Sequence, residues 1–394
     1  MNPIYLDNCK TTKPSPEAIE AMREWQEERY YLPANFTQYG TYMQRAIEKF
    51  KVAIAGTINA NVKEIHFTRG GTEANNIAIK GFLLANADKG THIICSQVDY
   101  PDLLTNAAFF EESGFSVTYL PCDKESIVSP EDLRKAIQPD TVLFMTTLVN
   151  HTTGAIQPLA EYRKILDSAQ QKIAIHVDAS QAYGKLPIDV NSPAIDLMSI
   201  SGHKIHAPMG IGVLYCRAGT HLKQIVHGVA RLDNLAPGGI SIAAMAGLVK
   251  ATEQIFSDRE GYENYLRSLT DYLLERVQNE IPAILVNGPL GKGRAAHNMN
   301  ITFRYIEGEA ILLMLDIAGI LTSTGSACFS QGMKPNYVMM AMGCTHEESH
   351  GSMKFTVSKY TTKEEIDITV DNLKIIVQEL RNRSPLCPDE LKTV

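Results

Sequence analysis

The chain has 394 residues, of which 44% are hydrophobic and 21% charged, and its formal net charge at pH 7 is −7. Such a length predicts roughly two or three domains, and the negative charge disfavours nucleic acid as the main partner. No stretch reaches the about 18 apolar residues of a membrane helix, and no amino-terminal secretion signal is present, so we expect a cytoplasmic protein that binds no membrane.

The first part of the chain alternates helical and strand-like patterns. Residues 15–30 begin with Ser15 as a helix cap and Pro16 at the first helical position, and their apolar residues recur at helical spacing. Seven short apolar runs follow, each too short for a buried helix: residues 64–68, 91–96, 116–121, 141–149, 172–179, 196–201 and 212–216. This order predicts an α/β domain over residues 15–255 with a mostly parallel, seven-stranded sheet, which binds ligands at the carboxyl ends of its strands.

The alternation ends after an amphipathic stretch at residues 246–281. The segments that follow mix helix and strand patterns without regular alternation; they are residues 297–305, 309–320, 351–357 and 364–382. We therefore expect a smaller α+β domain from residue 256 to 394, with a boundary near residue 255.

One lysine stands at an unusual place, in the stretch SISGHKIHAPMGIG at residues 199–212. Lys204 follows an apolar run directly, and burial at the end of a strand lowers a lysine's pKa and frees the neutral amine for bond formation with an aldehyde. On position alone, a solvated surface lysine fits better, so the rest of the chain has to decide. Ser201 and His203 flank Lys204 and can donate hydrogen bonds to a phosphate.

Two further strand ends carry polar residues. Asp178 ends the run KIAIHVDA, with Gln181 three residues on, and an acid in that position is costly unless a positive group pairs with it. The run EIHFT leads through Gly70 and Gly71 into Thr72 and a predicted helix, an arrangement that aims backbone N–H groups and a hydroxyl at a phosphate. Taken alone, the glycine pair could equally belong to an ordinary turn, and Asp178 could cap a helix or bind a metal.

Together these residues supply a phosphate cradle, an acid for a ring nitrogen and an amine for an aldehyde. Pyridoxal 5′-phosphate requires these three features, because the acid keeps its ring nitrogen protonated while the lysine holds its aldehyde. The sequence therefore predicts this cofactor.

Six segments resemble the class V aminotransferase-fold enzymes and, within that group, the cysteine desulfurases, over about residues 3 to 383. They are residues 4–8, 67–81, 176–189, 196–215, 325–343 and 360–367. The resemblance implies a fold type I pyridoxal-phosphate-dependent transferase and a homodimer whose small domain also includes residues 1–14. It further implies that a sulfur-acceptor or scaffold protein receives the sulfur, for iron–sulfur cluster or thio-cofactor synthesis.

The resemblance also implies a role for each site residue. Lys204 would hold the cofactor covalently, and Asp178 would pair with its ring nitrogen. The remaining contacts would come from Gln181 and Asn150 to the ring oxygen, with Asn150 also near the substrate, and from Gly71, Thr72, Ser201 and His203 to the phosphate.

The segment STGSACFSQG places Cys328 between glycine and small residues, as in an exposed loop. Cysteine desulfurases use a cysteine in such a setting to attack the substrate sulfur and carry it away as a persulfide, so we expect Cys328 to be the nucleophile for L-cysteine, with alanine released. The alternative is a small buried hydrophobe, which is the interpretation for Cys9, Cys95 and Cys122.

Several positions depart from the family pattern. The ring-stacking position, usually histidine, is Tyr100, whose pKa of about 10 makes it a poorer proton carrier at neutral pH. The substrate-carboxylate position, usually arginine, is Lys354, which lacks the bidentate fork. The usual NNEIG turn reads NHTTG. These changes surround the substrate, so the substrate is less certain than the cofactor.

Three alternatives follow. HEESH, from His346 to His350, matches the zinc-hydrolase string H-E-x-x-H, but Gly343 and Gly351 leave room for a short helix at most, so we expect no metal site. A related C–S or C–Se lyase, or a class V aminotransferase, would use Lys204 without Cys328. A weakly active, scaffold-like paralogue would keep the fold and cofactor alone.

Overall fold

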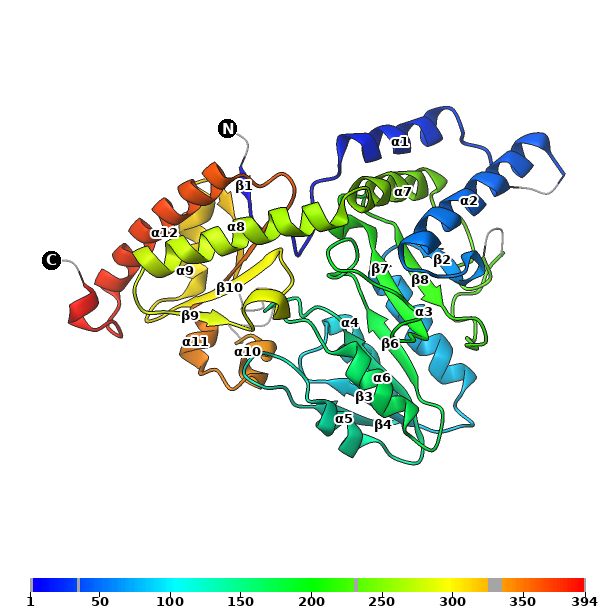
Figure 1. Cartoon of the computed structure of the whole chain (residues 1–394), viewed down its shortest axis with the longest axis horizontal. Coiled ribbons are helices and arrows are strands. Elements are labelled where there is room, and N and C mark those ends of the chain that lie inside the picture. The colour runs from blue at the N-terminus through cyan, green and yellow to red at the C-terminus, as the bar shows by residue number, and fades with distance from the viewer. Residues whose placement is uncertain (1–2, 34–35, 230–232, 325–334, 393–394) are drawn as a thin grey trace.

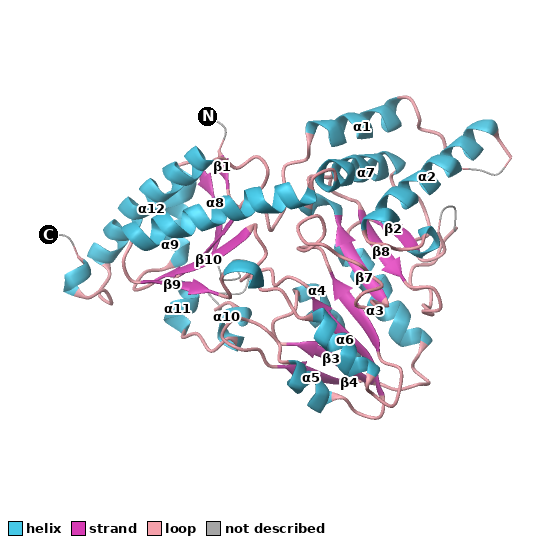
Figure 2. Cartoon of the chain, viewed as in Figure 1, coloured by secondary structure: helices cyan, strands magenta, loops and turns pink. Residues whose placement is uncertain are grey.

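The computed structural model describes residues 3–33, 36–229, 233–324 and 335–392. Its strands form three sheets, of seven, four and two strands, with helices packed around them (Figure 2). The seven-stranded sheet and its helices occupy one half of the molecule, and the two smaller sheets occupy the other half (Figure 1).

The seven-stranded sheet confirms the predicted α/β fold. Its strands are β2 (Ile65–Thr68), β3 (His92–Ser96), β4 (Ser116–Leu120), β5 (Thr141–Thr147), β6 (Ala174–Asp178), β7 (Leu197–Ser201) and β8 (Gly212–Cys216). Their spatial order is β2-β8-β7-β6-β5-β3-β4, and only β8 pairs antiparallel with its neighbours. All seven predicted apolar runs thus form strands of one sheet, and β2, β3, β5, β6 and β7 end at the same edge.

Helices precede and separate the strands of this sheet. They are α1 (Pro16–Glu27), α2 (Gln38–Thr57), α3 (Gly71–Ala85), α4 (Pro101–Glu112), α5 (Pro130–Ala136), α6 (Leu159–Asp167) and α7 (Ile242–Phe256), with short 3-10 turns η1 (Val62–Glu64) and η2 (Gly202–Lys204). Helix α1 begins as predicted, because the Ser15 hydroxyl accepts a hydrogen bond from the Ala18 N–H. Pro16 has no backbone N–H, and at the first helical position that group would have no partner within the helix. Helix α7 packs against α1 and α2.

The other half combines an antiparallel sheet with long helices. Its elements are β1 (Ile4–Tyr5), α8 (Arg259–Glu280), β9 (Ile284–Asn287), η3 (Gly291–Gly293), β10 (Asn298–Phe303), α9 (Gly308–Ile317), β11 (Ile320–Leu321), β12 (Ser323–Thr324), α10 (Tyr337–Ala341), α11 (His346–His350), β13 (Ser352–Thr356), α12 (Lys363–Arg383) and η4 (Asp389–Leu391). The four-stranded sheet has the order β12-β13-β10-β9, and β1 pairs with β11.

Buried hydrophobic side chains form two main clusters. One surrounds the seven-stranded sheet, and the other contains Leu6 together with side chains of α8, β10, α9, β13 and α12. Val338 and Met339 of α10 belong to the first cluster, although they lie in the part of the chain after residue 255 that we expect to form the smaller domain. The predicted domain boundary near residue 255 stays a prediction.

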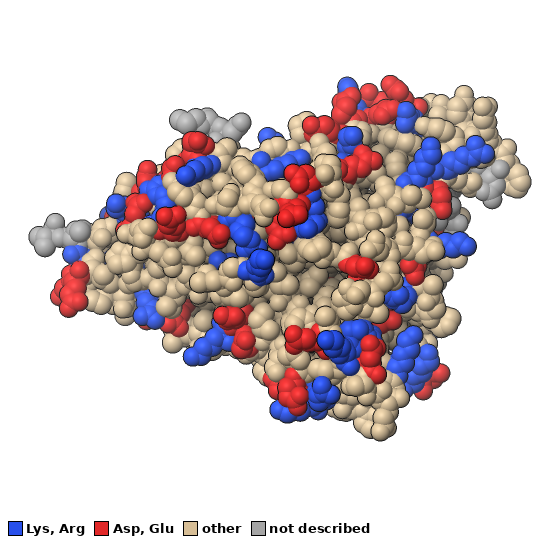
Figure 3. Space-filling model, viewed as in Figure 1, with Lys and Arg blue, Asp and Glu red and all other residues tan. Residues whose placement is uncertain are grey.

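The surface carries both signs of charge. Figure 3 shows lysine and arginine interspersed with aspartate and glutamate over this face, with no large field of one sign. None of the helices in the described part of the chain is long and apolar enough to span a membrane.

Candidate active site

A pocket of about 910 Å³ lies at the carboxyl ends of the strands. Because parallel strands end at the same edge, Thr147 of β5, Asp178 of β6 and Ser201 of β7 meet there. The predicted site residues that line the pocket are Gly71, Thr72, Tyr100, Asp178, Gln181, Ser201, His203, Lys204 and Lys354.

Lys204 lies in the turn η2 directly after β7, with only 6% of its surface exposed. Its Nζ donates hydrogen bonds to the backbone oxygens of Cys9 and of Lys10, the latter at 2.6 Å. Burial lowers the pKa of this amine to about 8, although the nearby Cys9 opposes the shift. About a tenth of the amine is therefore neutral at pH 7, far more than for a solvated lysine.

Asp178 is buried at the end of β6. Its Oδ2 accepts a hydrogen bond from Asn75 Nδ2 at 2.9 Å, and its Oδ1 accepts one from the Ser180 N–H at 2.8 Å. Burial raises the pKa of Asp178, while these hydrogen bonds oppose the rise. The carboxylate is thus fixed in place and is stabilised further by any positive group that enters the pocket.

The amino terminus of α3, where the sequence predicts a phosphate cradle, borders the pocket. A Cβ added at Gly71 would lie 2.9 Å from Ser180 Oγ and 3.2 Å from Ser201 Cβ, so only glycine lets these hydroxyl groups approach the helix end. Thr72 is the next residue of the helix, and His203 faces the same pocket. Backbone N–H groups at a helix amino terminus, with hydroxyls around them, suit a phosphate.

Tyr100 and Lys354 also line the pocket. Tyr100 precedes α4, and burial raises the pKa of its phenol to about 12. Lys354 lies on β13, and its Nζ donates to the backbone oxygen of His151 at 3.3 Å. A cation from β13 therefore faces the pocket that the seven-stranded sheet forms.

Asn150, which the resemblance predicts near the ring oxygen, is not among the described residues that line this pocket. Its side-chain oxygen accepts from the N–H groups of Thr152 and Thr153 at 2.9 and 3.0 Å, and its Nδ2 donates to the backbone oxygen of Val98 at 2.9 Å. Its amide group thus shapes the turn after β5 and is absent from the pocket wall among the described residues. The neighbouring residue His151, which the sequence did not single out, lines the pocket instead.

The cysteines differ in whether they lie in the described part of the chain, in the pocket or in the core. Cys328 lies outside the described residues. Cys9, predicted as a buried hydrophobe, is indeed only 3% exposed, but it also lines the pocket beside Lys204. The six cysteines in the described ranges are free thiols, and Cys95 is fully buried in the core.

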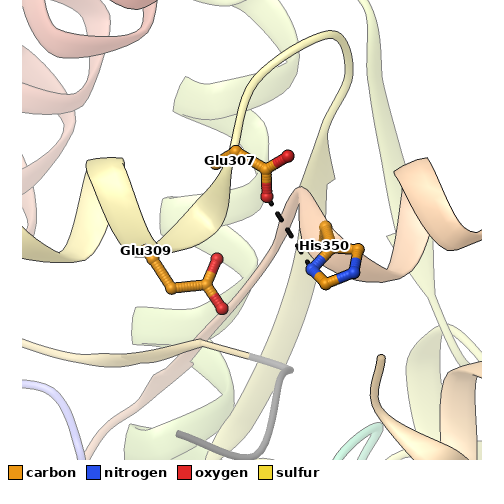
Figure 4. A group of neighbouring side chains, drawn as sticks. All are labelled: Glu307, Glu309 and His350. Atoms are coloured by element: carbon orange, nitrogen blue, oxygen red, sulfur yellow. Dashed lines mark ion pairs between the residues drawn. The ribbon is translucent and has the colours of Figure 1, made fainter. Parts of the chain in front are cut away.

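The HEESH string forms α11, a helix of five residues. Figure 4 shows His350 turned toward Glu307, with an ion-pair distance of 3.7 Å, and Glu309 nearby. Within the described ranges, the cluster of possible ligands that contains His350 includes neither His346 nor Glu347. A zinc hydrolase would require both histidines of the string in one ligand cluster, and in the described residues they do not share one.

Comparisons with known proteins identify the family of this chain. The family model for aminotransferase class-V matches residues 4–369. A cysteine desulfurase IscS of Methanosarcina thermophila is 41% identical over 391 residues, which cover 99% of this chain and 96% of the relative. The chain belongs to the cysteine desulfurase family. As a cysteine desulfurase it is a pyridoxal-phosphate-dependent sulfurtransferase.

Solved structures agree with the fold. A NifS-like protein has a TM-score of 0.90 at 26% identity and covers 96% of this chain and all (100%) of its own. SspA in complex with cysteine has a TM-score of 0.79 at 29% identity and covers 91% of this chain and 100% of its own. This cysteine desulfurase thus has the class V aminotransferase fold over nearly its whole length.

The residues present fit the cofactor. The cradle that a Cβ at Gly71 would fill suits its phosphate, the buried Asp178 carboxylate suits its protonated ring nitrogen, and the partly neutral Lys204 suits its aldehyde. All three features line one pocket.

Proposed function

We propose that this chain takes sulfur from L-cysteine as a persulfide on Cys328 and releases alanine. The observation that carries the proposal is that Lys204, Asp178 and the amino terminus of α3 line one pocket, into which Lys354 brings a positive charge. Pyridoxal phosphate, when bound, supplies an electron sink that lowers the cost of breaking bonds next to the amino nitrogen. The structure of SspA, solved with cysteine, supports the choice of substrate.

Each residue has a separate task in this proposal. Lys204 Nζ holds the aldehyde and moves protons, Asp178 holds the ring N–H proton by its negative charge, and Lys354 Nζ binds the substrate carboxylate. Thr72, Ser201 and His203 bind the phosphate. The Cys328 thiolate attacks the substrate sulfur: an S–S bond forms, the substrate C–S bond breaks, and its electron pair stays with the carbon fragment that takes up protons to become alanine.

The products of the wild-type holoenzyme test this function. With L-cysteine and a thiol reductant, we expect sulfide and alanine in equal amounts. Pyruvate in place of alanine would indicate a lyase, exchange with a keto acid would indicate an aminotransferase, and cofactor binding without any product would indicate the scaffold-like role. Cystine, selenocysteine and cysteine sulfinate serve as competing substrates in the same assay.

Substitution of Lys354 tests carboxylate binding. Lys354→Arg should lower KM for L-cysteine by up to about tenfold, because a guanidinium binds a carboxylate through two parallel hydrogen bonds, worth about 1 to 2 kcal/mol at best. Lys354→Met should raise KM and leave the cofactor bound. Lys374→Arg, with its charge on the exposed side of α12, is the matched control and should change neither constant. A lower KM for Lys354→Met would contradict the assignment.

We further propose that the chain is a cytoplasmic homodimer that passes sulfur to an acceptor or scaffold protein. Three large apolar side chains between α1 and α2 support dimerisation, because Tyr30, Leu32 and Phe36 are 70%, 60% and 100% exposed. Light scattering after size-exclusion chromatography should give twice the chain mass. Phe36→Ser should shift the protein toward the monomer, whereas Leu290→Ser, exposed elsewhere, should leave the mass unchanged.

A further inference from the structure

Two buried polar side chains connect to Asp178 from outside the pocket. Asn75 of α3 and His176 of β6 are fully buried, and neither lines the pocket in the described part of the chain. Asn75 Nδ2 donates to Asp178 Oδ2 at 2.9 Å, and Asn75 Oδ1 lies 2.9 Å from His176 Nε2. Asparagine is a weak helix former and a buried amide is costly without partners, so these two contacts account for its place inside α3.

The chemistry of the acceptors fixes the direction of this hydrogen-bonded chain. An ionised carboxylate can only accept, so the amide nitrogen of Asn75 faces Asp178 and the amide oxygen faces His176. At that second contact the imidazole therefore donates, through a proton on Nε2. Burial lowers the pKa of His176 to about 3, so the ring is neutral at pH 7 and carries a single proton. The chain thus runs from His176 through Asn75 to Asp178, with both N–H groups directed toward the carboxylate.

These hydrogen bonds favour the charged form of Asp178. Burial raises the pKa of this carboxyl, and the donors of Ser180 and Asn75 oppose the rise. The negative charge of Asp102 on α4 adds to the rise, and the Asn75 amide also donates to Asp102 Oδ2, at 3.4 Å. The other ionisable side chains that interact with Asp178 are those of Lys204 and Tyr100. Asn75 is thus one of the donors that keep a buried acid ionised.

We propose that Asn75 is a positioning residue, held in orientation by His176, that keeps the Asp178 carboxylate ionised and oriented for the ring nitrogen of the cofactor. A neutral Asp178 would no longer hold the ring N–H proton, and the electron sink would weaken. Without the His176 donor the amide would be free to rotate, and its oxygen would then repel the carboxylate. The inference rests on the role that the proposed function gives Asp178.

The proton affinity of Asp178 tests the proposal without turnover. In apo-protein labelled with ¹³C-aspartate, Asn75→Leu should raise the pKa of Asp178 above that of the wild type, because the charged form loses a donor. Asn86→Leu is the matched control, since Asn86 is a buried asparagine at the other end of the same helix. The control should change folding stability and leave the pKa of Asp178 as it is. The same pKa in Asn75→Leu and in the wild type would overturn the proposal.

In the holoenzyme, the protonation of the cofactor is the readout. With ¹⁵N-labelled pyridoxal phosphate, the ring-nitrogen signal of Asn75→Leu should move toward that of an unprotonated ring. The visible absorption band should persist, because Lys204 is unchanged. We expect kcat for L-cysteine to fall about 10- to 100-fold, since a hydrogen bond to a charged group is lost, and KM to change less than about threefold. A fully protonated ring nitrogen in Asn75→Leu would contradict the role of Asn75.

Substitutions of His176 test whether the orientation of the amide matters. His176→Leu leaves Asn75 in place and should reproduce much of the shift in the ring-nitrogen signal. His176→Gln keeps an N–H donor near the same position and should restore the wild-type signal. Because both residues belong to one chain, His176→Leu combined with Asn75→Leu should be no worse than Asn75→Leu alone. Additive losses of kcat would show that His176 does not act through Asn75, and would overturn that part of the proposal.

The same measurements separate this inference from the proposed function. If the wild type releases no alanine from L-cysteine but Asn75→Leu shifts the ring-nitrogen signal and the pKa of Asp178, the proposed function is wrong and the role of Asn75 stands. If the wild type releases alanine and neither signal responds to Asn75→Leu, the proposed function stands and the role of Asn75 is wrong.

Discussion

Lys204→Ala should remove the visible absorption of bound cofactor and lower kcat/KM for L-cysteine at least about 1000-fold, equivalent to about 4 kcal/mol of transition-state stabilisation. The reason is the position of this amine, which is buried at the end of β7 and has a pKa of about 8. Only the neutral amine attacks an aldehyde. Capture of added pyridoxal phosphate by the apo-protein should therefore become faster as pH rises through about 8.

Lys185→Met provides the matched control for this prediction. Lys185 is also buried, and burial lowers its pKa to about 8 as well, but it does not line the pocket. The Lys185 variant should keep the absorption band, although its folding stability changes. Borohydride reduction followed by peptide mass analysis should place the label on Lys204. A label on Lys185, or an unchanged band in Lys204→Ala, would show that the lysine is wrongly assigned.

Cys328→Ala should abolish release of sulfide and alanine from L-cysteine, by about 1000-fold or more, while the cofactor band and L-alanine binding remain. Without a thiolate, no S–S bond can form, so the substrate C–S bond has no acceptor for its sulfur. Mass spectrometry after turnover should find the extra sulfur atom of a persulfide on the Cys328 peptide of the wild type, and on no peptide of the variant.

Cys9→Ala is the control, because Cys9 is a thiol that lines the pocket beside Lys204. This variant should still form the persulfide on Cys328, since the backbone oxygen of residue 9, which accepts from Lys204, is retained. A persulfide found on Cys9, or alanine release at the wild-type rate by Cys328→Ala, would mean that the nucleophile is elsewhere.

Much of the site could be predicted from the sequence because it depends on strand ends. Asp178 and Ser201 each end an apolar run, and β6 and β7 are parallel neighbours, so the two residues meet at one edge. Gly71 is predictable in the same way, because a glycine pair between a strand and a helix marks a close approach of the backbone. In these cases local pattern and fold class together fix the direction of the side chain.

The turn after β5 shows where this reasoning stops. The family resemblance predicts Asn150 in the site, whereas the structure turns its amide toward Val98 and the turn backbone and brings His151 into the pocket wall. Two adjacent residues in a turn have no periodic pattern to say which one faces inward. The deciding partner, the backbone oxygen of Val98, lies 52 positions away along the chain.

By itself the sequence therefore determined the fold class, the cofactor and the residues at the strand ends, because apolar periodicity and strand direction are local properties that tertiary packing rarely reverses. Only the tertiary structure decided that Cys9 and His151 line the pocket. Cys9 is there because the amino-terminal segment crosses to the sheet, where the Thr12 N–H donates to the backbone oxygen of His203 at 2.8 Å. Its position depends on contacts between segments almost 200 residues apart, about which a local apolar run carries no information.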